Sequence, residues 1–451
     1  KELADTYVPN MLSGKWAGTM CLTEPQAGSS LNDASTSAKD LGDGTYAIKG
    51  QKIFISGGDN HFSENIIHLV LARLEGAPAG TKGISLLVVP KNRMENGELV
   101  QNEVVSLGVY HKMGQKATPA LHLSFGDKGA SIGYLVGEPN KGLKYMFQMM
   151  NEARIGVGMG GAYIASAAYL FSKQYANERS QGRLLTNKDP NTPPTLIKNH
   201  PDVQRMLYFQ KAIVEGSMGL LFQCLLWDDL TKCAEGEQQA EAQLLLDLMT
   251  TVAKTYPAEM GTLAVNQGLQ VLGGYGYTED FPLEQMARDV RIMSIYEGTT
   301  GIHGLTLLGR GIPANNGQAL QTLGKWIAKD IELGKSSDLM AKYAGMLEAE
   351  VANLTAVTMH KLGIAMKGEF DVYLADSSLY MELFGVVTVA WQWLKQGNVA
   401  AEALKTGGLS ADELAFYQDK IHTMKFFFHY EVPKALGLSK RLMDEEILTI
   451  F

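Results

Sequence analysis

The sequence predicts an α+β protein in which a β domain is followed by a long series of helices. Residues 14–130 contain short branched-aliphatic runs separated by closely spaced glycines, which is typical of strands joined by tight turns. From about Asn140 to the end, apolar residues recur at three- and four-residue spacing, which indicates amphipathic helices. Because no long helix separates the strands, we expect a barrel or a sandwich rather than a parallel sheet.

The helical part is divided by a Pro-Ala-Asn-Asn-Gly segment at residues 313–317. Such a segment is typical of a linker, so we expect a helical bundle at residues 131–312 and a further helical domain at residues 313–451. Residues 1–13 have helical apolar spacing disturbed by Pro9 and begin without a capping residue. We interpret them as the tail of a helix that another segment precedes.

The elements follow from the periodicity of the apolar residues. The predicted strands cover residues 46–48, 53–55, 66–71, 84–89 and 121–125, and the first two flank a Lys-Gly pair that we interpret as a turn. The predicted helices cover residues 143–180, 202–232, 237–272, 281–291, 300–311, 318–333, 337–367, 371–395 and 410–432. The Gly- and Pro-containing stretch at residues 180–201 is long enough for a functional loop.

Composition excludes several classes of protein. The chain has 451 residues, of which 45% are hydrophobic and 20% charged, and its net charge is -8, so it presents no basic surface for nucleic acid or anionic membranes. The three cysteines, Cys21, Cys224 and Cys233, fit neither a disulfide framework nor a metal-ligand spacing. The chain opens without a signal-peptide pattern. We therefore expect a cytoplasmic protein with free thiols, no metal, no nucleic-acid partner and no stable membrane insertion.

One sequence motif matches a nucleotide-binding pattern without indicating such a site. Residues 156–161, GVGMGG, match the dinucleotide-binding pattern GxGxxG. That pattern requires a preceding strand, whereas residues 146–154 have helical periodicity. We interpret these small residues as positions where a second helix packs closely.

The stretch at residues 273–304 leads to a single carboxylate. Residues 292–296 are mostly apolar and deliver the chain to Glu297, after which Gly298, Thr299 and Thr300 form a predicted turn into a helix. An apolar wall raises the pKa of a carboxyl group, which suits a general base. An acid in the first turn of a helix is also favoured by the helix dipole alone, and from this stretch the dipole explanation is the commoner one.

Two stretches of the β domain offer polar groups to a ligand. Residues 20–32, MCLTEPQAGSSLN, combine hydroxyls with a glycine turn, which suits a polar ring edge or a phosphate, although any capped loop has the same composition. Residues 50–58, GQKIFISGG, place Phe54 and Ser56 on one face of a strand. This pair suits a flat heterocycle, while a core Phe beside a rim Ser is the commoner arrangement.

Four motifs occur in the order and at the intervals of the acyl-CoA dehydrogenase family: TEPQAGS at 23–29, GQKIFISGG at 50–58, ERSQGR at 178–183, and LGGYGYTEDFPLEQMARDVRIMSIYEGTT at 272–300. The sequence resembles this family over residues 1–312. It is most similar to the branch with an extra C-terminal helical domain, which includes large bacterial fatty acyl-CoA dehydrogenases and 3-methylmercaptopropionyl-CoA dehydrogenases.

The resemblance implies the acyl-CoA dehydrogenase fold and a domain order. It assigns residues 1–13 to the tail of an N-terminal helical domain, 14–130 to the middle β domain, 131–312 to a catalytic four-helix bundle and 313–451 to a C-terminal helical extension. In the family the N-terminal domain closes one side of the acyl pocket. Because this chain starts where that domain would end, we expect the domain to be absent from it, the pocket to be open and the activity to be weak.

The resemblance also implies a reaction. Glu297 stands in the IYEGT context of the family's base, which removes the α-proton of an acyl thioester while its own backbone N–H and a flavin ribityl hydroxyl polarise the carbonyl. The implied cofactor is FAD, which takes the β-hydrogen as hydride. The positions that match FAD contacts are Leu22, Thr23, Gly28, Ser29, Phe54, Ser56, Arg179, Gln270, Gly273, Gly274 and Thr299. The positions assigned to the acyl-CoA are Ser29, Arg154, Tyr296 and Gly298.

Partners follow from the same resemblance. In the family the counterparts of Arg179, Gln270, Gly273 and Gly274 face the FAD of a neighbouring subunit, so a homodimer or a higher homo-oligomer is expected. Gly182 departs from the family pattern, because several relatives carry an aromatic residue there near the partner's flavin. The expected product is a trans-2-enoyl-CoA of fatty acid β-oxidation, with electrons passed to an electron-transfer flavoprotein. An acyl-CoA oxidase and a non-catalytic relative share these motifs and remain alternatives, and the acyl chain length stays open.

Overall fold

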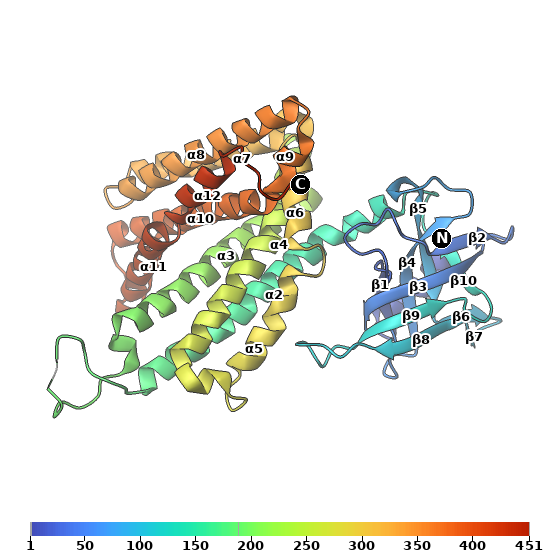
Figure 1. Cartoon of the computed structure of the whole chain (residues 1–451), viewed down its shortest axis with the longest axis horizontal. Coiled ribbons are helices and arrows are strands. Elements are labelled where there is room, and N and C mark those ends of the chain that lie inside the picture. Colours follow the sequence, from blue (N-terminus) through green and yellow to red (C-terminus); the bar gives the residue numbers. More distant parts are fainter. Residues whose placement is uncertain (1, 188, 451) are drawn as a thin grey trace. The chain divides into compact units, whose positions relative to one another are not determined.

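The computed structural model describes residues 2–187 and 189–450 and divides into two compact units, Lys1–Met150 and Asn151–Phe451. The first unit contains α1, the strands and the first residues of α2 (Figure 1). Its elements are α1 (Glu2–Leu12), β1 (Trp16–Cys21), β2 (Ser37–Asp40), β3 (Tyr46–Ser56), β4 (Asn65–Leu74), β5 (Ile84–Pro90), β6 (Asn92–Glu95), β7 (Glu98–Gln101), β8 (Val104–Val109), β9 (Ala120–Phe125) and β10 (Ser131–Leu135).

The main sheet has eight strands in the order β1-β4-β5-β10-β3-β9-β8, and β2 pairs with both β3 and β4. Because β2 joins these two, the strands β4, β5, β10, β3 and β2 form a closed ring. Of the two predicted arrangements, a barrel or a sandwich, the structure therefore has the barrel. Most pairs are antiparallel, while β1 and β2 run parallel to β4. Closure leaves no edge within this ring, while β1 and β8 remain at the two ends of the sheet. The interior is filled by apolar side chains that include Ile48, Val70, Leu87, Leu123 and Phe125.

The predicted turn at Lys49–Gly50 is wrong, because β3 runs through it as one strand from Tyr46 to Ser56. Gly50 serves a different purpose: a Cβ atom there would lie 2.5 Å from Thr36 Oγ1 and 2.8 Å from Thr36 Cα. The glycine therefore permits a close approach of two backbones rather than a reversal of the chain.

The remaining elements are helices (Figure 1). They are α2 (Gly142–Glu178), α3 (Pro201–Cys233), α4 (Gly236–Leu272), α5 (Leu283–Val290), α6 (Thr300–Thr306), α7 (Gln318–Lys335), α8 (Ala341–Met366), α9 (Phe370–Ala375), α10 (Ser377–Thr406), α11 (Ala411–Tyr430) and α12 (Lys434–Leu442). Short 3-10 helices η3 (Gly273–Tyr277) and η4 (Arg291–Ser294) connect α4, α5 and the turn before α6.

Two helix predictions need correction. The stretch predicted as one helix at 371–395 is broken at Asp376, whose φ and ψ of -99° and 26° are not helical, and α10 then continues to Thr406. Helix α12 was not predicted, since Pro433 ends the periodic pattern before it. The other predicted helices are confirmed within a few residues.

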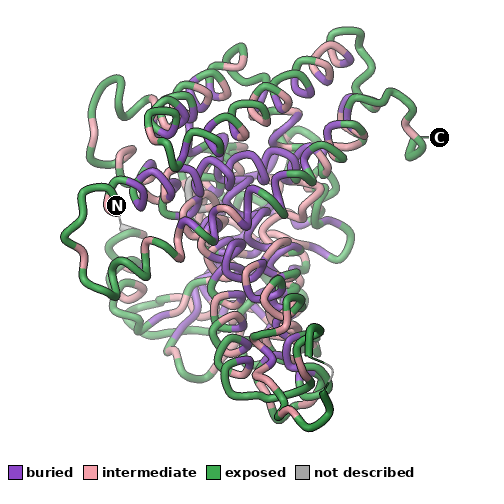
Figure 2. The backbone as a smooth tube through the Cα atoms, turned by 90° about the vertical axis from the view of Figure 1, so that its left-hand side faces the viewer, coloured by how far each residue is buried: buried purple, intermediate pink, exposed green. Residues whose placement is uncertain are grey.

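The second unit is built on close packing of long helices, and Figure 2 shows long buried stretches along them. The GVGMGG segment lies inside α2, and a Cβ atom at Gly158 would lie 2.0 Å from the carbonyl oxygen of Ala253 in α4. The interpretation of this motif as a packing surface is therefore confirmed. Helix α10 joins the C-terminal helices to the bundle, because its buried Trp393 donates to the carbonyl of Ala212 in α3 at 3.0 Å.

One helical segment, Met150–Glu178, is long and apolar enough to cross a membrane by length and composition, and 44% of its most apolar window is buried inside the structure. The core helix of a bundle has the same composition, so this segment does not by itself indicate a membrane span. The three cysteines are free thiols, as predicted.

Candidate active site

Glu297 lies in a strained turn between η4 and α6. Its φ is 55° and that of Gly298 is 93°, so two successive residues adopt left-handed conformations. For a residue other than glycine this costs about 1–3 kcal/mol and is typical of functional sites. Thr299 then caps α6, with its hydroxyl 3.4 Å from the amide of Ile302. The predicted turn into a helix is confirmed.

Side chains from two helices hold the carbonyl groups of this turn. Lys254 of α4 donates from Nζ to the carbonyl oxygen of Gly298 at 2.7 Å. His303 of α6 lies with Nε2 3.0 Å from the carbonyl oxygen of Glu297. A carbonyl only accepts, so His303 carries its proton on Nε2. Both side chains are fully buried, and burial lowers the pKa of His303 to about 3, which keeps the imidazole neutral.

The electrostatics of the turn favour a base. Glu297 is half-buried, and burial raises the pKa of its carboxyl group, while the positive charges of Arg154 and Lys254 oppose the rise. This is the direction that the apolar approach predicts. Arg154 lies on α2, Lys254 on α4 and His303 on α6, so three helices converge on the turn.

The neighbouring predicted residue, Tyr296, is half-buried and donates from its hydroxyl to Met293 Sδ at 3.2 Å. Thr300 donates to the carboxylate of Glu259 on α4. The contact with Glu259 joins the turn to α4, whereas the contact with Met293 is local and connects Tyr296 to η4. The structure thus brings Arg154, Tyr296, Glu297, Gly298 and Thr299 together in the second unit.

A second group of predicted residues lines an open cavity of about 530 Å³ in the same unit. Its walls come from the end of α2, the loop that follows and the end of α4, where Gly273 leaves the helix with a φ of 61°. The cavity is lined by Tyr175, Arg179, Gln181, Ile197, Gln270, Val271, Leu272, Gly273, Gly274, Tyr275 and Thr278. All four residues predicted to face a neighbouring subunit's FAD are among them.

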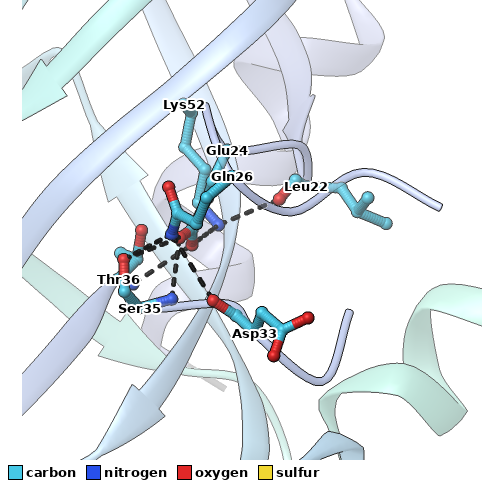
Figure 3. Close-up of polar contacts among 7 residues, drawn as sticks. All are labelled: Leu22, Glu24, Gln26, Asp33, Ser35, Thr36 and Lys52. Carbon is cyan, nitrogen blue, oxygen red and sulfur yellow. Dashed lines mark hydrogen bonds and ion pairs between the residues drawn. The ribbon is translucent and has the colours of Figure 1, made fainter. Parts of the chain in front are cut away.

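In the first unit a buried ion pair fixes the loop that carries Leu22 and Thr23. Lys52 Nζ lies 2.9 Å from Glu24 Oε1 and also donates to the carbonyl of Leu22 at 3.0 Å. Figure 3 shows Gln26, Ser35 and Thr36 around the same carboxylate, which accepts from the side chain of Gln26, from the amide and hydroxyl of Ser35 and from the amide of Thr36. Burial alone would raise the pKa of Glu24, but Lys52 and these hydrogen bonds lower the pKa to about 2.

The 22–29 loop lies against β3. The amide of Ile53 donates to the carbonyl of Thr23 at 2.9 Å. The next residue, Phe54, lies at a β-bulge and has a φ of 59°. Its side chain is 57% exposed, and its ring centroid lies 4.6 Å from that of Tyr110. Ser56 is also exposed, with buried Ile55 between them. The loop thus lies beside a solvent-accessible aromatic face.

The predicted site residues therefore form three groups. Leu22, Thr23, Gly28, Ser29, Phe54 and Ser56 lie in the first unit, with Gly28 and Ser29 exposed in the loop. The sequence did not identify Lys254, His303 or Lys52 as site residues. The one signal was that Lys254 is the only charged residue between Asp247 and Glu259. Across residues 2–187 and 189–450, no three His, Cys, Asp or Glu side chains are grouped to hold a metal ion.

Comparison with known proteins places this geometry in a family. Three family descriptions match the chain: acyl-CoA dehydrogenase, middle domain, over residues 19–127; acyl-CoA dehydrogenase, C-terminal domain, over 196–312; and acetyl-CoA dehydrogenase C-terminal like, over 320–449.

Individual relatives cover almost the whole chain. The 3-methylmercaptopropionyl-CoA dehydrogenase of Ruegeria pomeroyi is 38% identical over 441 residues, which are 97% of this chain and 73% of that protein. A butyryl-CoA dehydrogenase of Syntrophomonas wolfei is 33% identical over 457 residues, covering 98% and 73%. The crystal structure of an acyl-CoA dehydrogenase from Bacillus anthracis complexed with FAD has a TM-score of 0.78 at 21% identity, and the match covers 98% of this chain and 71% of that one. The chain therefore belongs to the acyl-CoA dehydrogenase family of oxidoreductases.

Proposed function

We propose that this protein is an FAD-dependent dehydrogenase that converts an acyl-CoA thioester into a trans-2-enoyl-CoA, with Glu297 as the base. The observation that supports this most directly is the environment of Glu297. Its carboxyl group is half-buried with a raised pKa, and a base with a raised pKa is better matched to a weakly acidic α-proton. It lies in a strained turn, in which Glu297 and Gly298 both have positive φ.

The backbone of the same residue provides the second chemical requirement. An α-proton beside a thioester becomes acidic enough to remove only if the carbonyl oxygen is stabilised as charge develops on it. No described residue accepts a hydrogen bond from the backbone amide of Glu297. This amide is therefore available to donate to the thioester oxygen, while Arg154, Tyr296 and Gly298 contact the substrate around it.

The residues of the first unit fit a flavin. Thr23 and Leu22 present loop backbone beside the exposed ring of Phe54 and the hydroxyl of Ser56, which together suit a flat heterocycle with a polar edge. Gly28 and Ser29 are exposed and suit its phosphates. Thr299 keeps its predicted role as an FAD contact. When bound, FAD accepts the β-hydrogen with its electron pair.

The cavity beside α4 supports the proposal that FAD is shared between subunits. Its arginine, Arg179, is exposed and suits a pyrophosphate. Gln270, Gly273 and Gly274 offer an amide and unobstructed backbone at the end of α4 for an adenosine. We therefore propose a homodimer in which each cavity receives the partner's cofactor.

Several finer features also belong to the proposal. The predicted domains at 14–130, 131–312 and 313–451 remain a proposal. The first boundary needs correction, because β10 (Ser131–Leu135) pairs with β3 and β5 and so belongs to the β domain. Electrons leave to an electron-transfer flavoprotein, and the protein acts in the cytoplasm. The named relatives act on butyryl-CoA and 3-methylmercaptopropionyl-CoA, so short linear acyl chains, with or without a thioether, are the first substrates to test.

The test is anaerobic mixing of the FAD-loaded protein with butyryl-CoA, 3-methylmercaptopropionyl-CoA and octanoyl-CoA while the flavin absorbance is followed. We expect bleaching with at least one substrate and none with Glu297→Gln, which removes the base but keeps the size of the side chain. Bleaching in Glu297→Gln at the parent rate would refute the role of Glu297. If hydrogen peroxide forms under air as fast as the substrate is consumed, the protein is an acyl-CoA oxidase rather than a dehydrogenase.

A further inference from the structure

The turn that carries Glu297 depends on two buried side chains from other helices. The carbonyl of Glu297 accepts from His303 at 3.0 Å and the carbonyl of Gly298 accepts from Lys254 at 2.7 Å. Both side chains are completely excluded from solvent. Burying an ammonium group is costly unless a specific interaction compensates for it, so the position of Lys254 calls for an explanation.

The turn needs such support because its backbone is strained. Glu297 and Gly298 both have positive φ, and the surrounding structure must over-determine a conformation of this kind for it to persist. The packing is close: a Cβ atom at Gly298 would lie 2.8 Å from His303 Nε2. With both carbonyls directed to internal donors, the peptide groups of the turn cannot rotate without breaking a buried hydrogen bond.

We propose that Lys254 and His303 are positioning residues for the base, that together they fix the 297–298 turn, and that the ammonium group of Lys254 also favours the ionised form of Glu297. This inference rests on the proposed function of Glu297. The two residues support the turn in different ways. His303 contributes a hydrogen bond alone, whereas Lys254 contributes a hydrogen bond and a charge.

The charges around the turn are consistent with this division. The charged groups that act on Lys254 are Glu259 of its own helix, Arg154 of α2 and Glu297. Burial lowers the pKa of Lys254 to about 8, and both carboxylates oppose the change, so the amine is mostly protonated at neutral pH. Arg154 and Lys254 are the two cations that act against the rise in the pKa of Glu297. His303 is neutral and adds no charge.

Four variants separate the hydrogen bond from the charge. Lys254→Gln keeps an N–H donor and removes the charge, while Lys254→Met removes both. His303→Gln keeps a donor and His303→Ala removes it, neither with any change of charge. The variants are compared at equal flavin content and with their thermal unfolding recorded, which separates a positioning effect from a failure to fold.

The readout should report the base without the hydride step. We suggest 3,3-dimethylbutanoyl-CoA, which has α-hydrogens and no β-hydrogen, incubated with the FAD-loaded enzyme in D₂O. Exchange of the α-hydrogens for deuterium, followed by mass spectrometry between pH 5 and pH 9, gives the apparent pKa of the base. The pH profile of flavin bleaching by the best substrate serves as a second readout.

We expect Lys254→Gln to move the acid limb of both profiles to higher pH by about one unit, which is about a tenfold slower reaction on that limb, with little loss at the plateau. Lys254→Met should show the same displacement and a plateau at least about tenfold lower. His303→Ala should lower the plateau without displacement, and His303→Gln should restore it.

Superimposable profiles for Lys254→Gln and the parent would overturn the charge role of Lys254. A His303→Ala plateau equal to that of the parent would overturn the positioning role of His303. Failure of the proposed function gives a different result. Either the parent would not exchange its substrate's α-hydrogens at all, or Glu297→Gln would exchange them as fast as the parent.

Discussion

The ammonium group of Lys52 and the carboxylate of Glu24 lie 2.9 Å apart with side-chain exposures of 0% and 1%. The pair joins β3 to the loop that carries Leu22 and Thr23, since Lys52 also donates to the carbonyl of Leu22. A charge placed in such a site without its partner is strongly unfavourable. The pair therefore determines where the proposed flavin loop lies.

The first prediction concerns this pair. Lys52→Met leaves Glu24 buried without its cation, and we expect the free energy of unfolding to fall by about 3–5 kcal/mol and flavin retention to fall with it. Lys15→Met is the control, because Lys15 and Glu64 form an exposed pair at 3.1 Å whose loss costs about 0–1 kcal/mol. Urea unfolding of both variants measures the difference. Equal losses would show that the buried pair does not hold the loop.

The second prediction concerns acid stability. The pKa of Glu24 is lowered from 4.5 to about 2 in the folded protein, so the unfolded chain binds this proton first as the pH falls. The stabilisation is therefore present in full above about pH 4.5 and is lost between about pH 4.5 and pH 2. Glu24→Gln should abolish this part of the pH dependence, which amounts to roughly 3 kcal/mol. If the unfolding free energies of the parent and of Glu24→Gln change in parallel with pH, Glu24 does not cause this pH dependence.

Particular residues show how far sequence reasoning reaches. Glu297 drew attention because its signal is local, an apolar approach followed by a Gly-Thr turn. That pattern alone favoured an ordinary first-turn acid, and only the family resemblance assigned the residue as a base. Lys254 and Lys52 were missed because their partners lie 44 and 28 residues away in the chain, and a buried lysine has no local pattern. The strand pattern predicted a barrel or a sandwich without deciding between them. The role of Gly50 depends on its approach to Thr36, which only the folded chain reveals.

The third prediction concerns the cavity that contains Arg179. If it receives a partner's pyrophosphate, Arg179→Ala should weaken FAD binding at least about tenfold, because a charge-assisted hydrogen bond is worth about 1.5–3 kcal/mol. Arg179→Lys should retain only part of the FAD affinity of the parent, since an ammonium group does not form the paired contacts of a guanidinium group. Flavin content after gel filtration measures the effect. Arg205→Ala, a change in an exposed arginine outside the cavity, is the control and should retain its flavin.

The fourth prediction uses two glycines of α2 that differ only in their surroundings. A Cβ atom at Gly156 meets nothing within 4 Å, whereas one at Gly158 would lie 2.0 Å from the carbonyl oxygen of Ala253. Gly156→Ala should therefore be neutral or stabilise the protein by up to about 1 kcal/mol, as expected for alanine in a helix. Gly158→Ala must force α2 and α4 apart and should destabilise it by about 1–3 kcal/mol.

The same pair tests whether helix packing is coupled to the active site. Ala253 immediately precedes Lys254, whose ammonium group holds the carbonyl of Gly298. A displacement of α4 at Ala253 therefore changes the 2.7 Å contact that supports the turn, so Gly158→Ala should lower the rate of flavin bleaching beyond what its loss of folded protein explains. Rates per bound flavin, measured well below the unfolding temperature, separate these effects. A Gly158→Ala enzyme that is destabilised yet reacts at the rate of Gly156→Ala would show that α4 moves without disturbing the base.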